Sequence, residues 1–191
     1  MTDEQHAKVS FDDEPLILVD SDDRVLGYKP KLDCHLGEGV LHRAFSVFLF
    51  DGKGNVLLHQ RAPDKMLWGG FWTNSCCSHP RRGETVDEAA GRRIREELGL
   101  EAEVEFVYRF EYFAPFEDKG SERELCSVYV GRAATDPAPN ETEIADWAWV
   151  DAASLAADLE ARPGRYTPWF KMEWKRLREE FWERVAPYAG A

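Results

Sequence analysis

A thiol and an imidazole lie two residues apart in the segment 73–80, which reads TNSCCSHP. Cys77 and His79 could act as a nucleophile with its base, as two metal ligands, or as ordinary side chains of a buried loop. The spacing alone does not distinguish these three roles. Glycine, proline and tryptophan occur around the pair without periodicity, so residues 61–83 are expected to be rich in loops.

Two carboxylates and two further histidines are also candidates for chemistry. Glu122 and Glu124 begin an expected strand, and residues two apart on a strand point to the same face. Like charges on one face favour a bound cation, although a solvated strand edge would also accept them. His35 and His42 lie in a segment expected to be irregular, 30–42, at a spacing that fits no zinc-finger or metalloprotease motif.

A helix is predicted at about 84–98, because apolar residues recur at every fourth position from Val86 to Leu98 and Gly99 can end it. Arg93 and Glu97 are four apart and share the edge of one helix face. An arginine that meets phosphate oxygens, beside a glutamate that holds Mg²⁺, would suit a diphosphate. The alternative is a surface ion pair that contributes a few tenths of a kcal/mol.

The same helix carries a longer pattern. Glu84 and the run 92–100, RRIREELGL, resemble the Nudix box. Ser78 stands where that box begins with glycine, and Arg93 stands where its first arginine is followed by glutamate. In Nudix hydrolases the missing glutamate helps to bind the metals of diphosphate hydrolysis. Its replacement by a cation favours a protein that holds a diphosphate without cutting it.

The segment 73–80 closely resembles the active-site cysteine segment of type I isopentenyl-diphosphate isomerases, and SERELC at 121–126 matches the family's Glu-any-Glu-apolar-Cys pattern. The resemblance extends from about Leu16 to Phe181 with motifs in family order. It implies an α/β (α+β) fold, a Nudix-like three-layer sandwich with a mixed β-sheet flanked by helices. It also implies the interconversion of isopentenyl and dimethylallyl diphosphate by protonation and deprotonation through a tertiary carbocation.

The resemblance implies a site residue by residue. One divalent metal, with Mn²⁺, Mg²⁺ or Zn²⁺ all suited to such ligands, would be bound by His35, His42, His79, Glu122 and Glu124. A Mg²⁺ on Glu97 would accompany the diphosphate, which would also meet Lys31, Arg61, Lys65, Ser78 and Arg93.

Proton transfer would fall to two groups on opposite sides of the substrate. Glu124, with Tyr112, is assigned to deliver the proton at C4, and Cys77 to remove one at C2, an order that is open to reversal. Trp169 matches the family's aromatic that faces the cation, which it would stabilise without a nucleophilic lone pair. Core packing is the alternative for any one of the 7 tryptophans.

Further elements are needed to position these residues. Strands are expected at 16–20, 25–29, 44–50, 56–60, 104–113, 124–133 and 147–150, the first two as a hairpin. Helices are expected at 151–160, with Asp151 as N-cap, and at about 168–185.

The composition of the 191 residues limits the remaining possibilities. An acidic tail, 1–14, is expected before a single domain, 15–191. The net charge of −12 argues against nucleic acid as a partner, and the absence of a secretory leader or an apolar run of membrane-spanning length predicts a cytoplasmic protein with reduced cysteines. No heptad or exposed strand signature is evident, so a monomer is expected.

Two rival functions follow from the same residues. A Nudix hydrolase of a nucleoside diphosphate derivative would need Glu96 and Glu97 as metal ligands and would not need Cys77. A non-catalytic module would keep the fold for binding metal or ligand alone, and the intact set of Cys77, Tyr112, Glu122, Glu124 and Trp169 counts against it.

Overall fold

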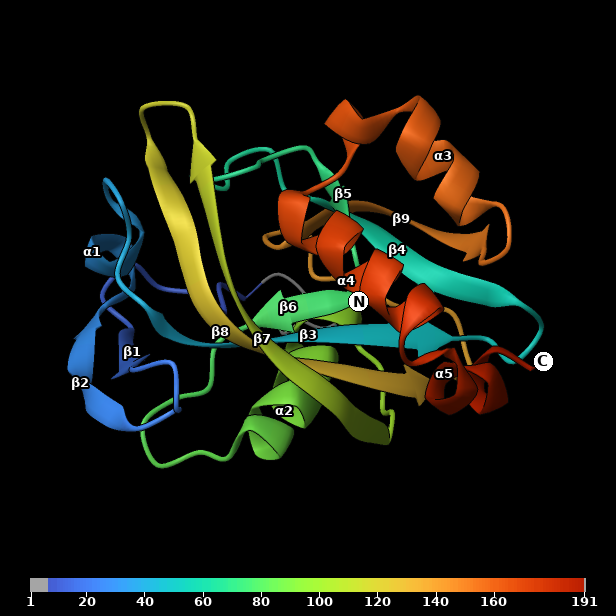
Figure 1. Cartoon of the computed structure of the whole chain (residues 1–191), viewed down its shortest axis with the longest axis horizontal. Helices are drawn as coiled ribbons and strands as arrows, with labels where there is room; N and C mark the ends of the chain where they lie inside the picture. Colours follow the sequence, from blue (N-terminus) through green and yellow to red (C-terminus); the bar gives the residue numbers. More distant parts are fainter. Residues whose placement is uncertain (1–6, 191) are drawn as a thin grey trace.

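The computed structural model describes residues 7–190, which form one mixed β-sheet with helices on both faces (Figure 1). The strands are β1 Pro15–Val19, β2 Val25–Pro30, β3 His42–Phe50, β4 Asn55–Arg61, β5 Trp72–Thr73, β6 Cys76–Ser78, β7 Val104–Phe116, β8 Gly120–Arg132 and β9 Ile144–Asp151. The helices are α1 Lys31–His35, α2 Val86–Leu98, α3 Leu155–Ala161, the 3₁₀ turn η2 Pro163–Arg165, α4 Pro168–Glu179 and α5 Trp182–Ala189.

The central strand β3 brings together segments that are far apart in the sequence. It pairs in parallel with β8, where His42 lies opposite Glu124. It also pairs in antiparallel fashion with β6, where Ser46 lies opposite Cys77. The β7–β8 hairpin places Tyr112 opposite the same Glu124. The register of β3 therefore aligns an imidazole, a thiol, a carboxylate and a phenol along one part of the sheet.

Alternate residues of β3 face two separate cores. Phe45 and Leu49 pack toward α2 with Ile94, in a core that covers one face of the sheet. Phe48 packs on the opposite face against Phe170 of α4, in a core that also receives α3 and α5. Figure 1 shows α2 on one side of the sheet and α4 and α5 on the other, so the expected three-layer arrangement is present.

Helix α2 confirms the predicted amphipathic helix. A capping box joins Thr85 and Glu88 at its start, and its first turn begins at Val86 rather than at residue 84. Gly99 ends it in the left-handed conformation at φ 61°, where its N–H donates to the Arg95 carbonyl oxygen. A capping box followed by a glycine C-cap fixes both ends of the helix that carries Arg93 and Glu97.

Several element predictions were wrong. The segment expected to be irregular, 30–42, contains α1, and β9 is longer than 147–150. Asp151 is the last residue of β9 and not an N-cap: its Oδ1 accepts from the N–H of Ser154, and α3 begins only at Leu155. The single helix expected at 168–185 is divided into α4 and α5 near Phe181, whose ring stacks on Tyr108 with centroids 4.7 Å apart.

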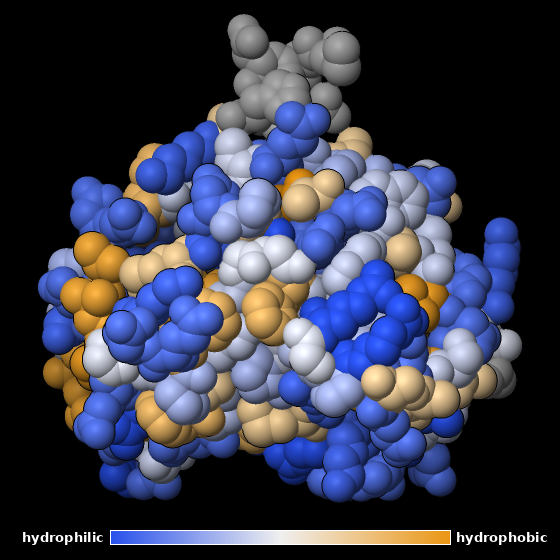
Figure 2. All heavy atoms as spheres, turned by 90° about the horizontal axis from the view of Figure 1, so that it is seen from above, coloured by the Kyte–Doolittle hydropathy of each residue, from blue (hydrophilic) through white to orange (hydrophobic). Residues whose placement is uncertain are grey.

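The surface seen in Figure 2 is largely polar, as expected from the many charged residues in the sequence. Figure 2 shows one face covered mainly by hydrophilic side chains, with apolar groups in small separate patches. Within the described residues, none of the helices has the length and apolar character needed to cross a membrane.

Candidate active site

A cavity of about 580 Å³ opens between the sheet, α1, α2 and α4. The side chains predicted to act in catalysis, substrate binding or metal binding meet at this cavity, although they come from segments scattered over the chain. Those that line it are Lys31, His35, Arg61, Lys65, Cys77, Ser78, His79, Arg93, Glu97, Tyr112, Glu122, Glu124 and Trp169. His42 is the one that does not line it, because it is fully buried behind His79 and Glu124.

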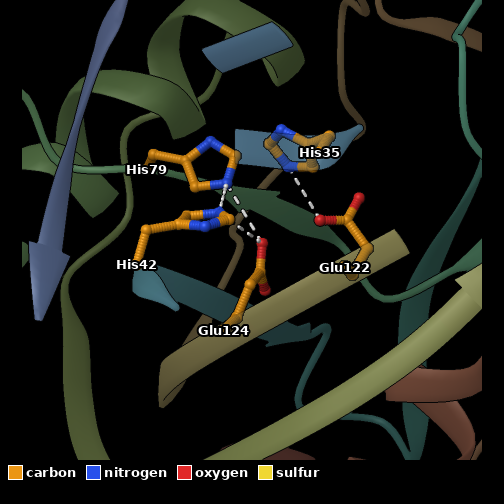
Figure 3. Close-up of side chains that lie close together, drawn as sticks. All are labelled: His35, His42, His79, Glu122 and Glu124. Carbon is orange, nitrogen blue, oxygen red and sulfur yellow. Dashed lines mark hydrogen bonds and ion pairs between the residues drawn. The ribbon is translucent and has the colours of Figure 1, made fainter. Parts of the chain in front are cut away.

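Three histidines and two glutamates converge at one end of the cavity (Figure 3). One ligand atom from each of His35, His42, His79, Glu122 and Glu124 lies within 4.8 Å of all the others. The Nε2 atoms of His42 and His79 are 3.1 Å apart, and Glu124 Oε1 is 3.0 Å from His79 Nε2. His35 Nε2 lies 2.8 Å from a Glu122 carboxylate oxygen.

The backbone orients two of these imidazoles. Nδ1 of His35 lies 2.6 Å from the Lys31 carbonyl oxygen, and Nδ1 of His42 lies 2.7 Å from that of Val40. Both contacts turn Nε2 inward, as the outer partners of metal-bound histidines commonly do. The short helix α1 places Lys31 and His35 one turn apart, so that a cation and a ligand face the same cavity.

The charges of His79, Glu122 and Glu124 match what metal ligands require, whereas the neighbouring Glu122 outweighs burial and raises the pKa of His35. Burial, followed by the neighbouring His42, holds the pKa of His79 well below its ordinary value. Burial raises the pKa of Glu122 and of Glu124, yet the facing histidines outweigh it and both carboxyl pKa values are lowered. A neutral imidazole and ionised carboxylates are the forms that bind metals.

The donor set fits a divalent cation. Two imidazole Nε2 atoms that face each other at 3.1 Å, with a carboxylate oxygen at 3.0 Å, need a proton or a metal between them. Imidazole nitrogen and carboxylate oxygen together suit a borderline divalent ion. The described residues can therefore hold one divalent metal at this end of the cavity.

Next to this group lie a thiol, a phenol and an indole. Tyr112 Oη donates to Glu124 Oε2 at 2.7 Å. Burial raises the pKa of the Cys77 thiol to about 12, and Arg61 Nη1 lies 3.9 Å from its sulfur. The Trp169 ring is buried at the cavity wall, with its centroid 6.3 Å from that of Tyr112.

Hydrogen bonds tie the start of α4 to the segment that carries Cys77. Thr167 Oγ1 and Thr73 Oγ1 are 2.9 Å apart, and the Thr167 N–H donates to the Trp72 carbonyl oxygen at 3.0 Å. Pro168 then opens the helix, which suits its missing N–H. Trp169 is thereby fixed in relation to Cys77 from a distant part of the chain.

Cations also line the cavity. Arg93 is 3% exposed, and its Nε and Nη2 donate to Glu97 Oε1 at 2.8 and 2.7 Å. The pair is buried, so the alternative of a surface ion pair is wrong. Burial raises the pKa of Glu97 although Arg93 opposes it. The Glu97 carboxyl oxygen is the hard ligand that Mg²⁺ prefers, and it would bind the ion once the carboxyl has released its proton.

Two features of the site were missed by sequence reasoning. Glu143, just before β9, lines the cavity and contacts both Lys65 and Arg93. Residues 7–14 also touch the cations: the Val9 carbonyl oxygen accepts from Arg93 Nη1 at 2.7 Å, and Lys31 Nζ donates to Ser10 Oγ at 2.5 Å. Neither feature has a local signal, because both depend on long-range folding.

Comparisons with known proteins agree with this geometry. A family model described as NUDIX domain matches residues 40–170. The crystal structure of DR0079 from Deinococcus radiodurans superposes with a TM-score of 0.70 at 26% identity, over 85% of this chain and 98% of that one. The MutT protein of Methanosarcina mazei Go1 shares the fold with a TM-score of 0.59 at 17% identity, over 73% of this chain and 94% of that one. The fold and the site therefore define a protein of the NUDIX class.

Curated relatives narrow the class further. The Isopentenyl-diphosphate Delta-isomerase 2 of Photorhabdus laumondii is 43% identical over 86% of this chain and 99% of its own length. The Isopentenyl-diphosphate Delta-isomerase of Serratia proteamaculans is 42% identical over 94% of this chain and 99% of its own length. The chain belongs to the isopentenyl-diphosphate Delta-isomerase family.

Proposed function

We propose that the protein interconverts isopentenyl diphosphate and dimethylallyl diphosphate. The observation that carries the proposal is the meeting, in one cavity, of the Cys77 thiol with the Glu124–Tyr112 pair and the Trp169 indole. Protonation of the isopentenyl double bond at C4 makes a tertiary carbocation at C3. It therefore requires an acid, a base and a surface that stabilises positive charge without attacking it.

Each proton has a defined origin and destination. For isopentenyl diphosphate, Glu124 with Tyr112 gives a proton to C4, the former alkene electrons form the new C–H bond, and C3 becomes the cation. Cys77 as thiolate then takes a proton from C2, and the electrons of that C–H bond form the new double bond. In the reverse direction the Cys77 thiol delivers a proton to C2, and the Glu124 carboxylate takes one from C4.

The protonation state of Cys77 bears on this order. Burial holds the thiol protonated at neutral pH, which is the form that starts the reverse direction. Turnover of isopentenyl diphosphate therefore requires a prior proton shift from Cys77 toward Glu124, through solvent or through the cavity. Exclusion of water afterwards protects the cation from capture.

Two metal roles belong to the proposal. A divalent ion, Mn²⁺, Mg²⁺ or Zn²⁺, held by His35, His42, His79, Glu122 and Glu124 would tune the acidity of the Glu124–Tyr112 pair. A Mg²⁺ held by Glu97 would neutralise charge on the diphosphate beside Lys31, Arg61, Lys65, Ser78 and Arg93. Binding energy from this charged end can orient the small hydrocarbon end.

Incubation with isopentenyl diphosphate in deuterated water tests the function directly. The expected result, read by NMR, is dimethylallyl diphosphate that carries deuterium. Release of phosphate without isomer would instead favour the rival hydrolase, against which Arg93 at the box's glutamate position already counts.

Cys77→Ala tests the catalytic assignment. This variant should lose turnover by at least a hundredfold, because general acid–base groups contribute about 10²–10⁴-fold. Its affinity for diphosphate should stay near that of the unaltered protein. Retention of full turnover would remove Cys77 from the mechanism.

A further inference from the structure

The cations of the cavity differ in their partners. Lys65 Nζ lies 2.5 Å from Glu143 Oε2, and Arg93 Nη2 lies 3.3 Å from the same oxygen. Among the described residues, no carboxylate lies within ion-pair distance of Lys31 or Arg61. Two of the four cations are thus paired with Glu143, whereas Lys31 and Arg61 donate to uncharged groups, the Ser10 hydroxyl and the Leu67 carbonyl oxygen.

Glu143 is held where it can act on the cavity. It is 7% exposed, its N–H donates to the Asn140 carbonyl oxygen at 3.0 Å, and its own carbonyl oxygen accepts from the Ala62 N–H at 2.9 Å. Although burial raises the pKa of its carboxyl, Lys65 and then Arg93 hold that pKa below its ordinary value. An anchored, ionised carboxylate therefore faces the charged end of the cavity.

A phosphate group entering this end needs the same N–H donors. A phosphate oxygen that binds Lys65 and Arg93 must displace Glu143 Oε2 or lie close beside it, and like charges that close repel. A divalent cation on the diphosphate relieves this repulsion, because it can meet both the phosphate and the carboxylate oxygens.

We infer that Glu143 is a specificity-determining residue that competes with free diphosphate for Lys65 and Arg93, and so makes the cavity select the magnesium complex of a diphosphate. The inference rests on the proposed function and extends it to the form of substrate that binds. It assigns Glu143 no part in proton transfer.

Inorganic pyrophosphate is the probe that tests the inference, because it carries the charged end of the substrate alone. Its dissociation constant is measured by calorimetry with Mg²⁺ and with EDTA, for the unaltered protein and for Glu143→Gln. The variant is expected to bind Mg²⁺-free pyrophosphate about tenfold more tightly than the unaltered protein, with a smaller gain from Mg²⁺.

Asp23→Asn is the matched control. Asp23 also accepts from two cations, Arg43 at 2.5 Å and Arg109 at 2.6 Å, but does not line the cavity. Its substitution removes the same charge and should leave both dissociation constants unchanged. Glu143→Asp, which draws the carboxylate back from Lys65, should give an intermediate effect and serves if the glutamine variant does not fold.

The outcomes separate the inference from the function. If Glu143 is purely structural, its loss should weaken binding. Equal or weaker affinity for Mg²⁺-free pyrophosphate in Glu143→Gln and Glu143→Asp would therefore overturn the inference, while the proposed diphosphate site would stand. Failure of the unaltered protein to bind pyrophosphate, even with Mg²⁺, would show that the proposed residues do not form a diphosphate site, and the inference would fall with it.

Discussion

At the scale of single residues, the site depends on groups whose charges are set by burial and by one near neighbour. Tyr112 and Glu124 share a hydrogen bond of 2.7 Å inside the cavity, and burial raises the phenol pKa well above its ordinary value. The phenol therefore keeps its proton and donates a hydrogen bond to the carboxylate. Sequence reasoning identified both residues by resemblance, whereas their contact follows from the β7–β8 register.

Tyr112→Phe should lower kcat by about a hundredfold or more, because it removes this donor while keeping the ring. The KM for isopentenyl diphosphate should change little, since the cations that meet the diphosphate remain. Tyr108→Phe is the matched control: Tyr108 is on the same strand, its Oη donates to the Glu173 carbonyl oxygen at 3.4 Å, and it does not line the cavity. Equal rates for the two variants would exclude the phenol from proton transfer.

Metal binding at the histidine–glutamate group should stabilise the fold, because a ligand that binds only the folded state adds free energy of unfolding. We expect Mn²⁺ or Zn²⁺ to raise the Tm of the EDTA-treated protein by several degrees, in thermal melts monitored by circular dichroism. Glu122→Gln should lose most of this rise. His59→Gln, which alters a buried histidine outside the group, should keep it. A rise that survives in Glu122→Gln would place the ion elsewhere.

At the scale of elements, α4 joins the site to the core. It carries Trp169 at its first turn and Glu173 one turn later, with the Glu173 carboxyl fully buried near Cys126. The sequence predicted a helix here but not its end near Phe181, where the Phe181 ring stacks on the distant Tyr108. The α2 helix was predicted more accurately, since its capping residues are local.

Glu173 should make the stability of the fold depend on pH. Burial raises its pKa from 4.5 to about 8, so the folded chain keeps this proton at pH values where the unfolded chain releases it. Below pH 4.5 the ionisation of this carboxyl does not affect the free energy of unfolding. As the pH rises from 4.5 toward 8, the free energy of unfolding falls by at most about 1.4 kcal/mol per pH unit.

Glu173→Gln cannot ionise and should therefore match the unaltered protein in Tm near pH 4.5 and exceed it by several degrees at pH 8. Melting curves between these values, at constant ionic strength, provide the measurement. A constant difference in Tm across the range would mean that Glu173 does not titrate between the two states.

At the scale of the whole molecule, hydrophobic patterning and turns predicted most strands, and the resemblance to a known family predicted the class of fold and the three layers. It did not predict α1, Glu143 as a neighbour of Lys65, or the contacts of residues 7–14. These depend on segments far apart in the chain, which local patterns do not encode. The division into a tail, 1–14, and a domain, 15–191, stays a prediction.

Deletion of residues 1–12 tests that division. The hydrophobic cores on the two faces of the sheet contain none of the deleted residues, so the Tm should fall by only a few degrees. The KM for the diphosphate should rise several-fold, because Val9 and Ser10 no longer orient Arg93 and Lys31. A large loss of Tm would show that the N-terminal residues belong to the domain.

The shared strand β3 has a consequence for how the protein matures. If β3 and β8 paired one residue out of step, His42 would turn to the opposite face from Glu124, because strand side chains alternate. Such a misaligned chain could still bury much of its apolar surface but could not retain the metal. Metal binding by this group would therefore report that the two strands have paired in the correct register.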